Sequence, residues 1–154
     1  MSNSSKEFSK FASSFNKNEE IRTASLQDID HLESSLNIKL PEDFSIFIQH
    51  YGNLWTPNIL DIIVDNDIEM NDIQQFMLPE EILEDKREGF TSQVDEDLIP
   101  FASDCMGNLY AFKTSDIEKE HSTAKVYFFD HDLDEVYFIA NSFRAMIQGF
   151  NSLI

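Results

Sequence analysis

The clearest hydrophobic pattern in the chain lies in LPEDFSIFIQHYGNLW, residues 40–55. Four of its apolar side chains recur at positions i, i+3, i+4 and i+7: Phe44, Phe47, Ile48 and Tyr51. This spacing forms one stripe along a helix. Pro41 suits the first helical position, where no N–H is needed, and Gly52 permits the left-handed backbone that ends a helix. The stretch therefore predicts a short buried helix that leads into an extended segment.

Two further helices are predicted before this stretch. Three phenylalanines at helical spacing with lysines between them predict a short amphipathic helix within residues 6–17. Ser25 and Asp28 have the spacing of a capping box, and the apolar positions that follow continue a helical face to Leu36. Residues 1–24 therefore form an N-terminal segment whose helix docks on the domain formed by residues 25–154.

Two helices are also predicted in the second half of the chain. Pro79 opens a helix that extends to about Lys86, with Ile82 and Leu83 as its inward residues. Asn141 or Ser142 caps a helix at the C-terminus. Its inward stripe consists of Phe143, Met146, Ile147 and Phe150.

Short apolar runs separated by turn residues predict two antiparallel hairpins. The first joins strands at 98–102 and 109–112 through Gly107 and its neighbours, and the second joins strands at 126–129 and 136–139. Helices at both ends of a strand-rich middle predict a single α+β domain, with helices packed against a mostly antiparallel sheet.

The segment between residues 54 and 76 is harder to interpret. Residues 59–64 form an apolar run that is short for a helix, so we expect a strand there, paired with residues 54–55 across a turn at 56–58. Residues 68–76 are expected to add one or two turns of helix.

The charge of the chain is strongly one-sided. It has 29 acidic and 11 basic side chains, a net charge of −18. Residues 61–104 hold 14 acids against Lys86 and Arg87, a local net charge of 2 − 14 = −12. Such a surface repels nucleic acid and anionic lipid and attracts basic partners, so we expect neither direct nucleic-acid binding nor membrane binding. General solubility is the alternative interpretation of this acidity.

The sequence contains no recognisable catalytic or metal-binding motif. Asp130, Asp132 and Asp134 alternate like the first ligands of a calcium loop, but Glu135 occupies the position that requires glycine. Cys105 follows an aspartate that raises the pKa of its thiol, and the four histidines lie far apart in the sequence. We therefore expect no enzymatic activity, no metal and no cofactor.

The sequence shows no segment that would direct the protein to a membrane or out of the cell. Its start lacks the apolar run of a signal peptide, and no stretch is apolar enough to span a bilayer. A single cysteine forms no intramolecular disulfide. These observations predict a cytoplasmic protein, and they leave its oligomeric state open.

The order of the motifs resembles the SMI1/KNR4 family, also called the SUKH superfamily. The succession runs from the helix at Ser25 through LPEDFSIFIQHYGN and IPFASDCMGNLYAFKT to NSFRAMIQGF, over roughly residues 25–152. The family pattern often continues after its tyrosine with asparagine and glycines, whereas this chain has Tyr51-Gly52-Asn53-Leu54. The resemblance implies a small domain with helices against an antiparallel sheet.

The resemblance also implies a function. Members of the family are mostly bacterial immunity proteins that neutralise polymorphic toxins, and fungal relatives are regulatory interaction proteins. The first hypothesis is an immunity protein that occludes the active site of a basic toxin domain, such as a nuclease, with its acidic surface. The alternative is a regulatory adaptor without a toxin.

The hypothesis names a set of partner-binding residues. A buried aromatic anchor strengthens an interface, whereas surrounding charges speed encounter. Trp55 is the candidate anchor, and a place in the core is its alternative. The candidate acidic residues are Asp65, Asp67, Glu69, Asp72, Glu80, Glu81, Asp95, Glu96 and Asp97.

Overall fold

The computed structural model describes residues 3–89, 95–120 and 122–154, which fold around one antiparallel sheet. The helices are α1 (Asn3–Phe15), α2 (Leu26–Leu36), α3 (Glu42–His50), α4 (Asn58–Asp65), α5 (Pro79–Glu88), α7 (Thr114–Glu120) and α8 (Phe143–Asn151). The strands are β1 (Gln75–Phe76), β2 (Leu98–Ser103), β3 (Leu109–Lys113), β4 (Val126–Asp130) and β5 (Glu135–Ala140). The expected α+β architecture is confirmed.

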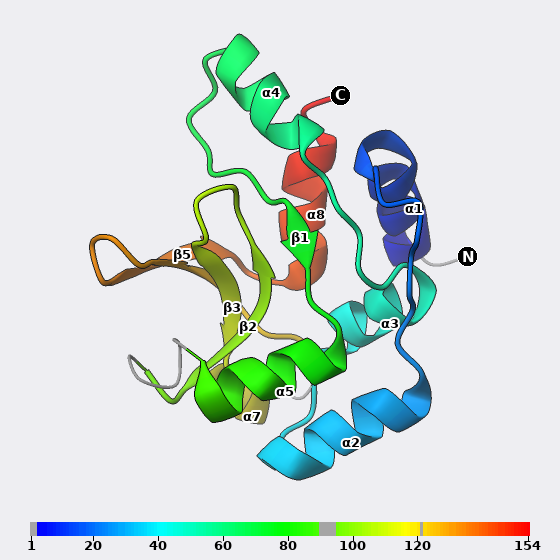
Figure 1. Cartoon of the computed structure of the whole chain (residues 1–154), viewed down its shortest axis with the longest axis vertical. Helices are drawn as coiled ribbons and strands as arrows, with labels where there is room; N and C mark the ends of the chain where they lie inside the picture. Colours follow the sequence, from blue (N-terminus) through cyan, green and yellow to red (C-terminus); the bar gives the residue numbers. More distant parts are fainter. Residues whose placement is uncertain (1–2, 90–94, 121) are drawn as a thin grey trace.

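The strands follow one another across the sheet in the order of the sequence, β1-β2-β3-β4-β5 (Figure 1). Both predicted hairpins, β2–β3 and β4–β5, are present. Leu109, the first residue of β3, pairs with Phe129 near the end of β4. The turns of the two hairpins consequently lie at the same end of the sheet.

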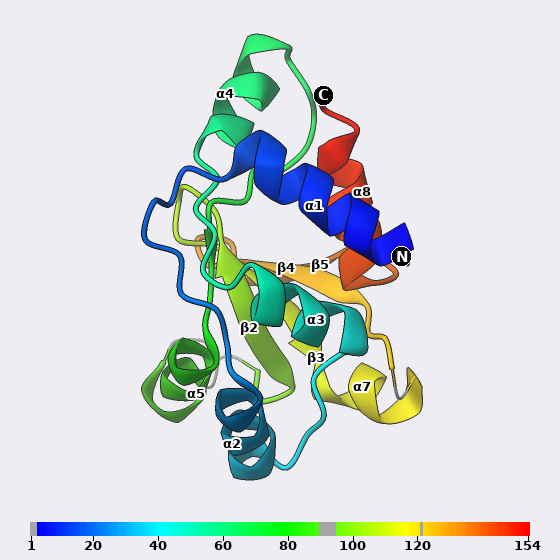
Figure 2. The ribbon, with the colours of Figure 1, turned by 90° about the vertical axis from the view of Figure 1, so that its right-hand side faces the viewer.

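Three helices cover one face of the sheet: α1, α3 and α8 (Figure 2). Their contacts are aromatic, and Phe143 of α8 lies at the centre. Its ring centroid is 5.0 Å from that of Phe47, 5.2 Å from that of Phe44 and 5.5 Å from that of Phe101 in β2. Phe8 and Phe11 bring α1 into the same cluster. The N-terminal segment is therefore packed into the main core.

The helix that the hydrophobic pattern predicted most clearly is α3. Phe44, Phe47 and Ile48 are fully buried. Pro41 lies one position earlier than expected, as the residue before the helix. Gly52 has a φ of +64°, and a Cβ atom there would lie 1.8 Å from the carbonyl oxygen of Arg22, so the backbone requires glycine.

The caps predicted for two other helices are confirmed. The Ser25 hydroxyl accepts the N–H of Asp28 and the Asp28 carboxylate accepts the N–H of Ser25, which completes the capping box of α2. The Ser142 hydroxyl accepts the N–H of Ala145 at the start of α8. Asp43 adds a link that local sequence does not reveal, because its carboxylate accepts the N–H of Arg144 at 3.0 Å.

Three expectations about secondary structure are wrong. Residues 59–64 form helix α4 instead of a strand, because Ile59 and Ile63 are four residues apart and are buried together. No hairpin forms at 56–58, where the chain turns into α4. Residues 68–76 are not helical: the segment extends and ends in β1, which pairs with β2. Helix α7 was not anticipated.

Candidate protein-binding surface

Acidic segments lie at the end of the sheet that carries the hairpin turns and in the loop that runs from α4 to that end (Figure 1). We define the hairpin end as residues 65–72, the β2–β3 turn at 104–108 and the β4–β5 turn at 130–135. Gln75 pairs with Ser103, so the chain that enters β1 arrives beside the β2–β3 turn. These segments contain four, one and four carboxylates, nine in total, and no lysine or arginine. This end of the molecule therefore has strong negative charge.

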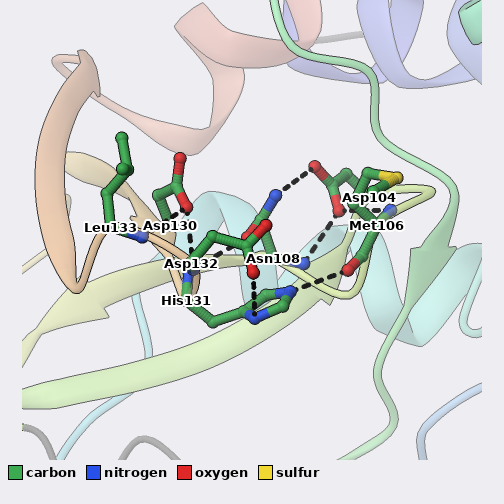
Figure 3. Close-up of polar contacts among 7 residues, drawn as sticks. All are labelled: Asp104, Met106, Asn108, Asp130, His131, Asp132 and Leu133. Carbon is green, nitrogen blue, oxygen red and sulfur yellow. Dashed lines mark hydrogen bonds and ion pairs between the residues drawn. The ribbon is translucent and has the colours of Figure 1, made fainter.

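Hydrogen bonds connect the two turns (Figure 3). The Asn108 side chain donates to the Asp104 carboxylate at 3.0 Å and accepts the N–H of His131 at 3.0 Å. The Asp104 carboxylate also accepts the N–H groups of Met106 and Asn108. Asn108 is itself buried. The turns are thus held in a fixed arrangement.

His131 is the histidine of the hairpin end. Its Nε2 is 2.8 Å from the carbonyl oxygen of Met106, and its Nδ1 is 3.4 Å from the carboxylate of Asp132. The Met106 carbonyl and then the charges of Asp132 and Asp130 raise the pKa of His131. Because these groups favour the imidazolium, mildly acidic conditions add a positive charge to this end.

Asp72 differs from the other candidate acids because it is buried, with 5% of its surface exposed. Its carboxylate accepts the N–H of Cys105 at 3.1 Å, and burial raises its pKa. Partial desolvation and the hydrogen bond with Asp72 raise the pKa of the Cys105 thiol to about 11, so this thiol stays protonated at neutral pH. Asp72 holds the loop against the turn instead of facing solvent.

The remaining candidate acids lie at the other end of the sheet. We define the α5 end as α5 with residues 95–97, which immediately precede β2. Glu80 forms an ion pair with Arg22 at 3.3 Å, and the carboxylate of Glu81 accepts the N–H of Leu78 at 3.0 Å. Lys86 donates to the carbonyl oxygens of Glu96 and Leu98. The carboxylates of Glu80 and Glu81 and the ammonium group of Lys86 therefore already have partners within the protein.

Asp97 has a structural role at the α5 end. Its carboxylate accepts hydrogen bonds from the Thr114 hydroxyl and from the N–H and hydroxyl of Ser115. Thr114 and Ser115 begin α7, so Asp97 caps that helix from a distance in the sequence. Burial alone would raise the pKa of Asp97, but these hydrogen bonds outweigh it and hold the pKa below its usual value.

Trp55 lies on the surface, with 43% of its area exposed, so its alternative place in the core is wrong. Its backbone forms a bridge with Gln75 at the edge of the sheet beside β1, and its N–H donates to the Asn16 side chain. The remaining sequence candidates at the hairpin end, Asp65, Asp67 and Glu69, are also exposed. Asp67 has a φ of +51°, a left-handed conformation that Asp tolerates better than most residues.

Sequence reasoning missed a groove beside the hairpin end. The groove has a volume of about 350 Å³ and lies between residues 69–71, the last part of β5 and α8. Its lining is mainly apolar and includes Met70, Ile139, Met146 and Phe150. The helical spacing of α8 predicted which of its side chains face inward. It could not predict that residues 69–71 and β5 cover α8 incompletely and form a groove beside it.

The described residues contain neither a metal-binding cluster nor a helix that could span a membrane. Within residues 3–89, 95–120 and 122–154, no three His, Cys, Asp or Glu side chains are arranged to hold a metal ion. None of the helices described in the same ranges has the length and apolarity needed to cross a membrane.

Comparison with known proteins identifies the family. A search of curated proteins finds no significant match. The family model SMI1 / KNR4 (SUKH-1) matches residues 23–149, which is most of the chain and includes every element from α2 to most of α8. Helix α1 precedes the matched region. The chain therefore belongs to the SMI1/KNR4 family (SUKH-1).

Proposed function

We propose that this protein is an immunity protein that binds a basic toxin domain through the hairpin end and occludes its active site. Membership of a family known for immunity proteins supports this function. The observation that carries the location is that three segments toward one end of the fold contain nine carboxylates and no lysine or arginine. Enzymes that hold phosphates need basic side chains around their sites, so a nuclease is the toxin class that this charge fits best.

The mechanism has an electrostatic step and a steric step. The exposed carboxylates of Asp65, Asp67 and Glu69 increase the rate of encounter with a basic surface. The connected turns then cover the active site as a preformed surface, and their acidic groups replace the charge of the phosphates. Trp55 lies at the outer edge of the sheet beside β1, and it is an additional anchor for a toxin that reaches around this edge.

The experiment uses the C-terminal domain encoded by the reading frame directly upstream of this gene as the probe. Co-expression should restore growth to cells that the toxin domain alone inhibits. Surface plasmon resonance should show that the association rate falls at least ~10-fold between low and physiological salt, with little change in the dissociation rate.

Different results separate the components of the proposal. A complex whose association rate is constant across this salt range would exclude the acidic mechanism. An isolated gene with no toxin reading frame nearby, or a neighbouring domain that neither harms cells nor binds, would contradict immunity and favour a regulatory adaptor. For Trp55, substitution by alanine tests the anchor: a faster dissociation by ~30-fold, about 2 kcal/mol, would place it in the interface.

A further inference from the structure

Gly149 is the feature of the groove that the fold does not explain. It lies inside α8, where glycine destabilises a helix by roughly 0.5–1 kcal/mol relative to alanine. A Cβ atom at Gly149 would have no neighbouring atom of the described residues within 4 Å, whereas a Cβ at Gly52 would collide with backbone. Packing within the described chain therefore does not require glycine at this position. The open space beside Gly149 belongs to the groove.

The surroundings of Gly149 form an apolar floor with a fixed shape. Met146 and Phe150 of the same helix are almost completely buried and form the base of the groove, and Ile139 and Ala140 of β5 form the facing wall. Tyr110 lies beneath them, and its hydroxyl donates to the carbonyl oxygen of Asp72 at 2.9 Å. This bond holds the loop that carries Met70 at the rim.

The charge of the rim restricts the occupant. Among the described residues that line the groove, Glu69 is the charged side chain, and none is lysine or arginine. The groove is continuous with the hairpin end through residues 69–71. A second copy of this chain would bring its own net charge of −18 toward these acids, so a basic partner fits better than self-association.

We propose that the groove beside Gly149 binds an aliphatic or aromatic side chain carried on a basic segment of a protein partner. The absence of a side chain at Gly149 lets that segment approach the α8 backbone closely, while Glu69 and the hairpin end attract its lysines or arginines. The proposal rests on the proposed function in that it describes the apolar contact that accompanies the acidic surface. The acidic charges speed association, and the apolar contact in the groove would slow dissociation.

The experiment selects peptides from a phage-displayed random library on the wild-type protein and measures their affinities by fluorescence polarisation. The selected peptides should carry several lysines or arginines around one large apolar residue. Gly149→Trp fills the groove and should weaken their binding at least ~10-fold. Gln148→Trp is the matched control, because it adds the same side chain to an exposed neighbouring position that does not line the groove.

Gly149→Ala separates a binding role from a structural role. It should raise the melting temperature, because alanine favours the helix and its Cβ has open space, and it should weaken peptide binding. Circular dichroism should confirm that all three variants fold.

Four outcomes would overturn the proposal. They are the absence of enriched peptides, enriched peptides without basic residues, equal binding to Gly149→Trp, and self-association of the wild type that Gly149→Trp abolishes in sedimentation experiments. None of these outcomes depends on toxin neutralisation, so a failure here is distinguishable from a failure of the immunity function.

Discussion

The two acidic ends of the sheet have similar numbers of carboxylates but use them differently. The hairpin end has nine and the α5 end has eight, five in α5 and three in residues 95–97. At the α5 end, Lys86 and Arg87 lie within the same segments and Arg22 pairs with Glu80. Within the described residues, no ion pair reaches Asp65, Asp67 or Glu69 at the hairpin end. Similar composition thus gives one end with basic side chains among its acids and one end at which Asp65, Asp67 and Glu69 stay exposed and outside the ion pairs of the described residues.

The difference teaches that a count of acidic residues does not locate an interface. A carboxylate that accepts several internal hydrogen bonds, like that of Asp97, contributes to folding and has little capacity left for a partner. An exposed carboxylate without such bonds contributes almost nothing to folding and repels its neighbours. The comparison therefore predicts that Asp97 and the exposed acids Asp65, Asp67 and Glu69 respond in opposite ways to substitution.

The largest expected effect is on stability at the α5 end. Asp97→Ala removes three hydrogen bonds to the start of α7 and should lower the free energy of unfolding by about 2 kcal/mol. The melting temperature should fall by about 6 °C. Urea unfolding and thermal scans measure both quantities. Glu96→Ala, which removes an exposed carboxylate next to it, is the matched control and should change little. Equal effects of both substitutions would contradict a capping role.

The pH dependence of the same site sharpens this test. The folded-state pKa of Asp97 is lower than its ordinary value of 3.8, so the ionised form stabilises the folded state. This stability is present above the unfolded-state pKa and is lost as the pH falls through the folded-state pKa. The difference in stability between wild type and Asp97→Asn should therefore be full at pH 7 and shrink below about pH 4. A difference that persists unchanged in acid would show that ionisation of Asp97 is not involved.

The next effect concerns association at the hairpin end. Asp65→Lys combined with Asp132→Lys reverses two exposed charges and should slow association with the upstream toxin domain by ~10-fold at low salt. The fold should tolerate both changes, and a positive charge at position 65 would even interact favourably with the negative end of α4. Glu84→Lys combined with Glu88→Lys makes the same change in net charge at the α5 end. If both pairs slow association equally, only total charge matters and the hairpin end has no special role.

The sequence predicted those parts of the fold that depend on neighbouring residues. Helix α3, the capping box of α2 and the two hairpins were all predicted, because stripe spacing, caps and turns act over a few residues. Residues 59–64 were misassigned because a six-residue apolar run has too few positions to separate helical from strand spacing. The buried pair that decides the case, Ile59 and Ile63, faces a core formed by distant segments.

The candidate site was less predictable, because it depends on contacts between distant residues. The list of acids mixed both ends of the sheet, and the meeting of the two hairpin turns appears only in the pairing of β3 with β4 and in the hydrogen bonds between the turns. Asp97 is hydrogen-bonded to residues 17 and 18 positions later, and Asp43 to one 101 positions later. No local pattern distinguishes such an acid from a solvated one. The groove beside Gly149 likewise requires residues 69–71 and Tyr110 to meet the neighbouring elements β5 and α8.

The smallest expected effect concerns the ion pair between Arg22 and Glu80. Their side chains are 66% and 55% exposed, so water screens the pair and its coupling in a double-mutant cycle should be about 0.5 kcal/mol or less. Loss of the pair should change the association rate with a basic partner more clearly than it changes the free energy of unfolding. Arg22→Ala leaves the Glu80 carboxylate uncompensated, which makes the α5 end more attractive to a basic partner and should raise its association rate slightly, by less than ~2-fold. Stopped-flow kinetics at low salt measures this change. A decrease in the association rate would mean that Arg22 itself contacts the partner, and the α5 end would then belong to the interface.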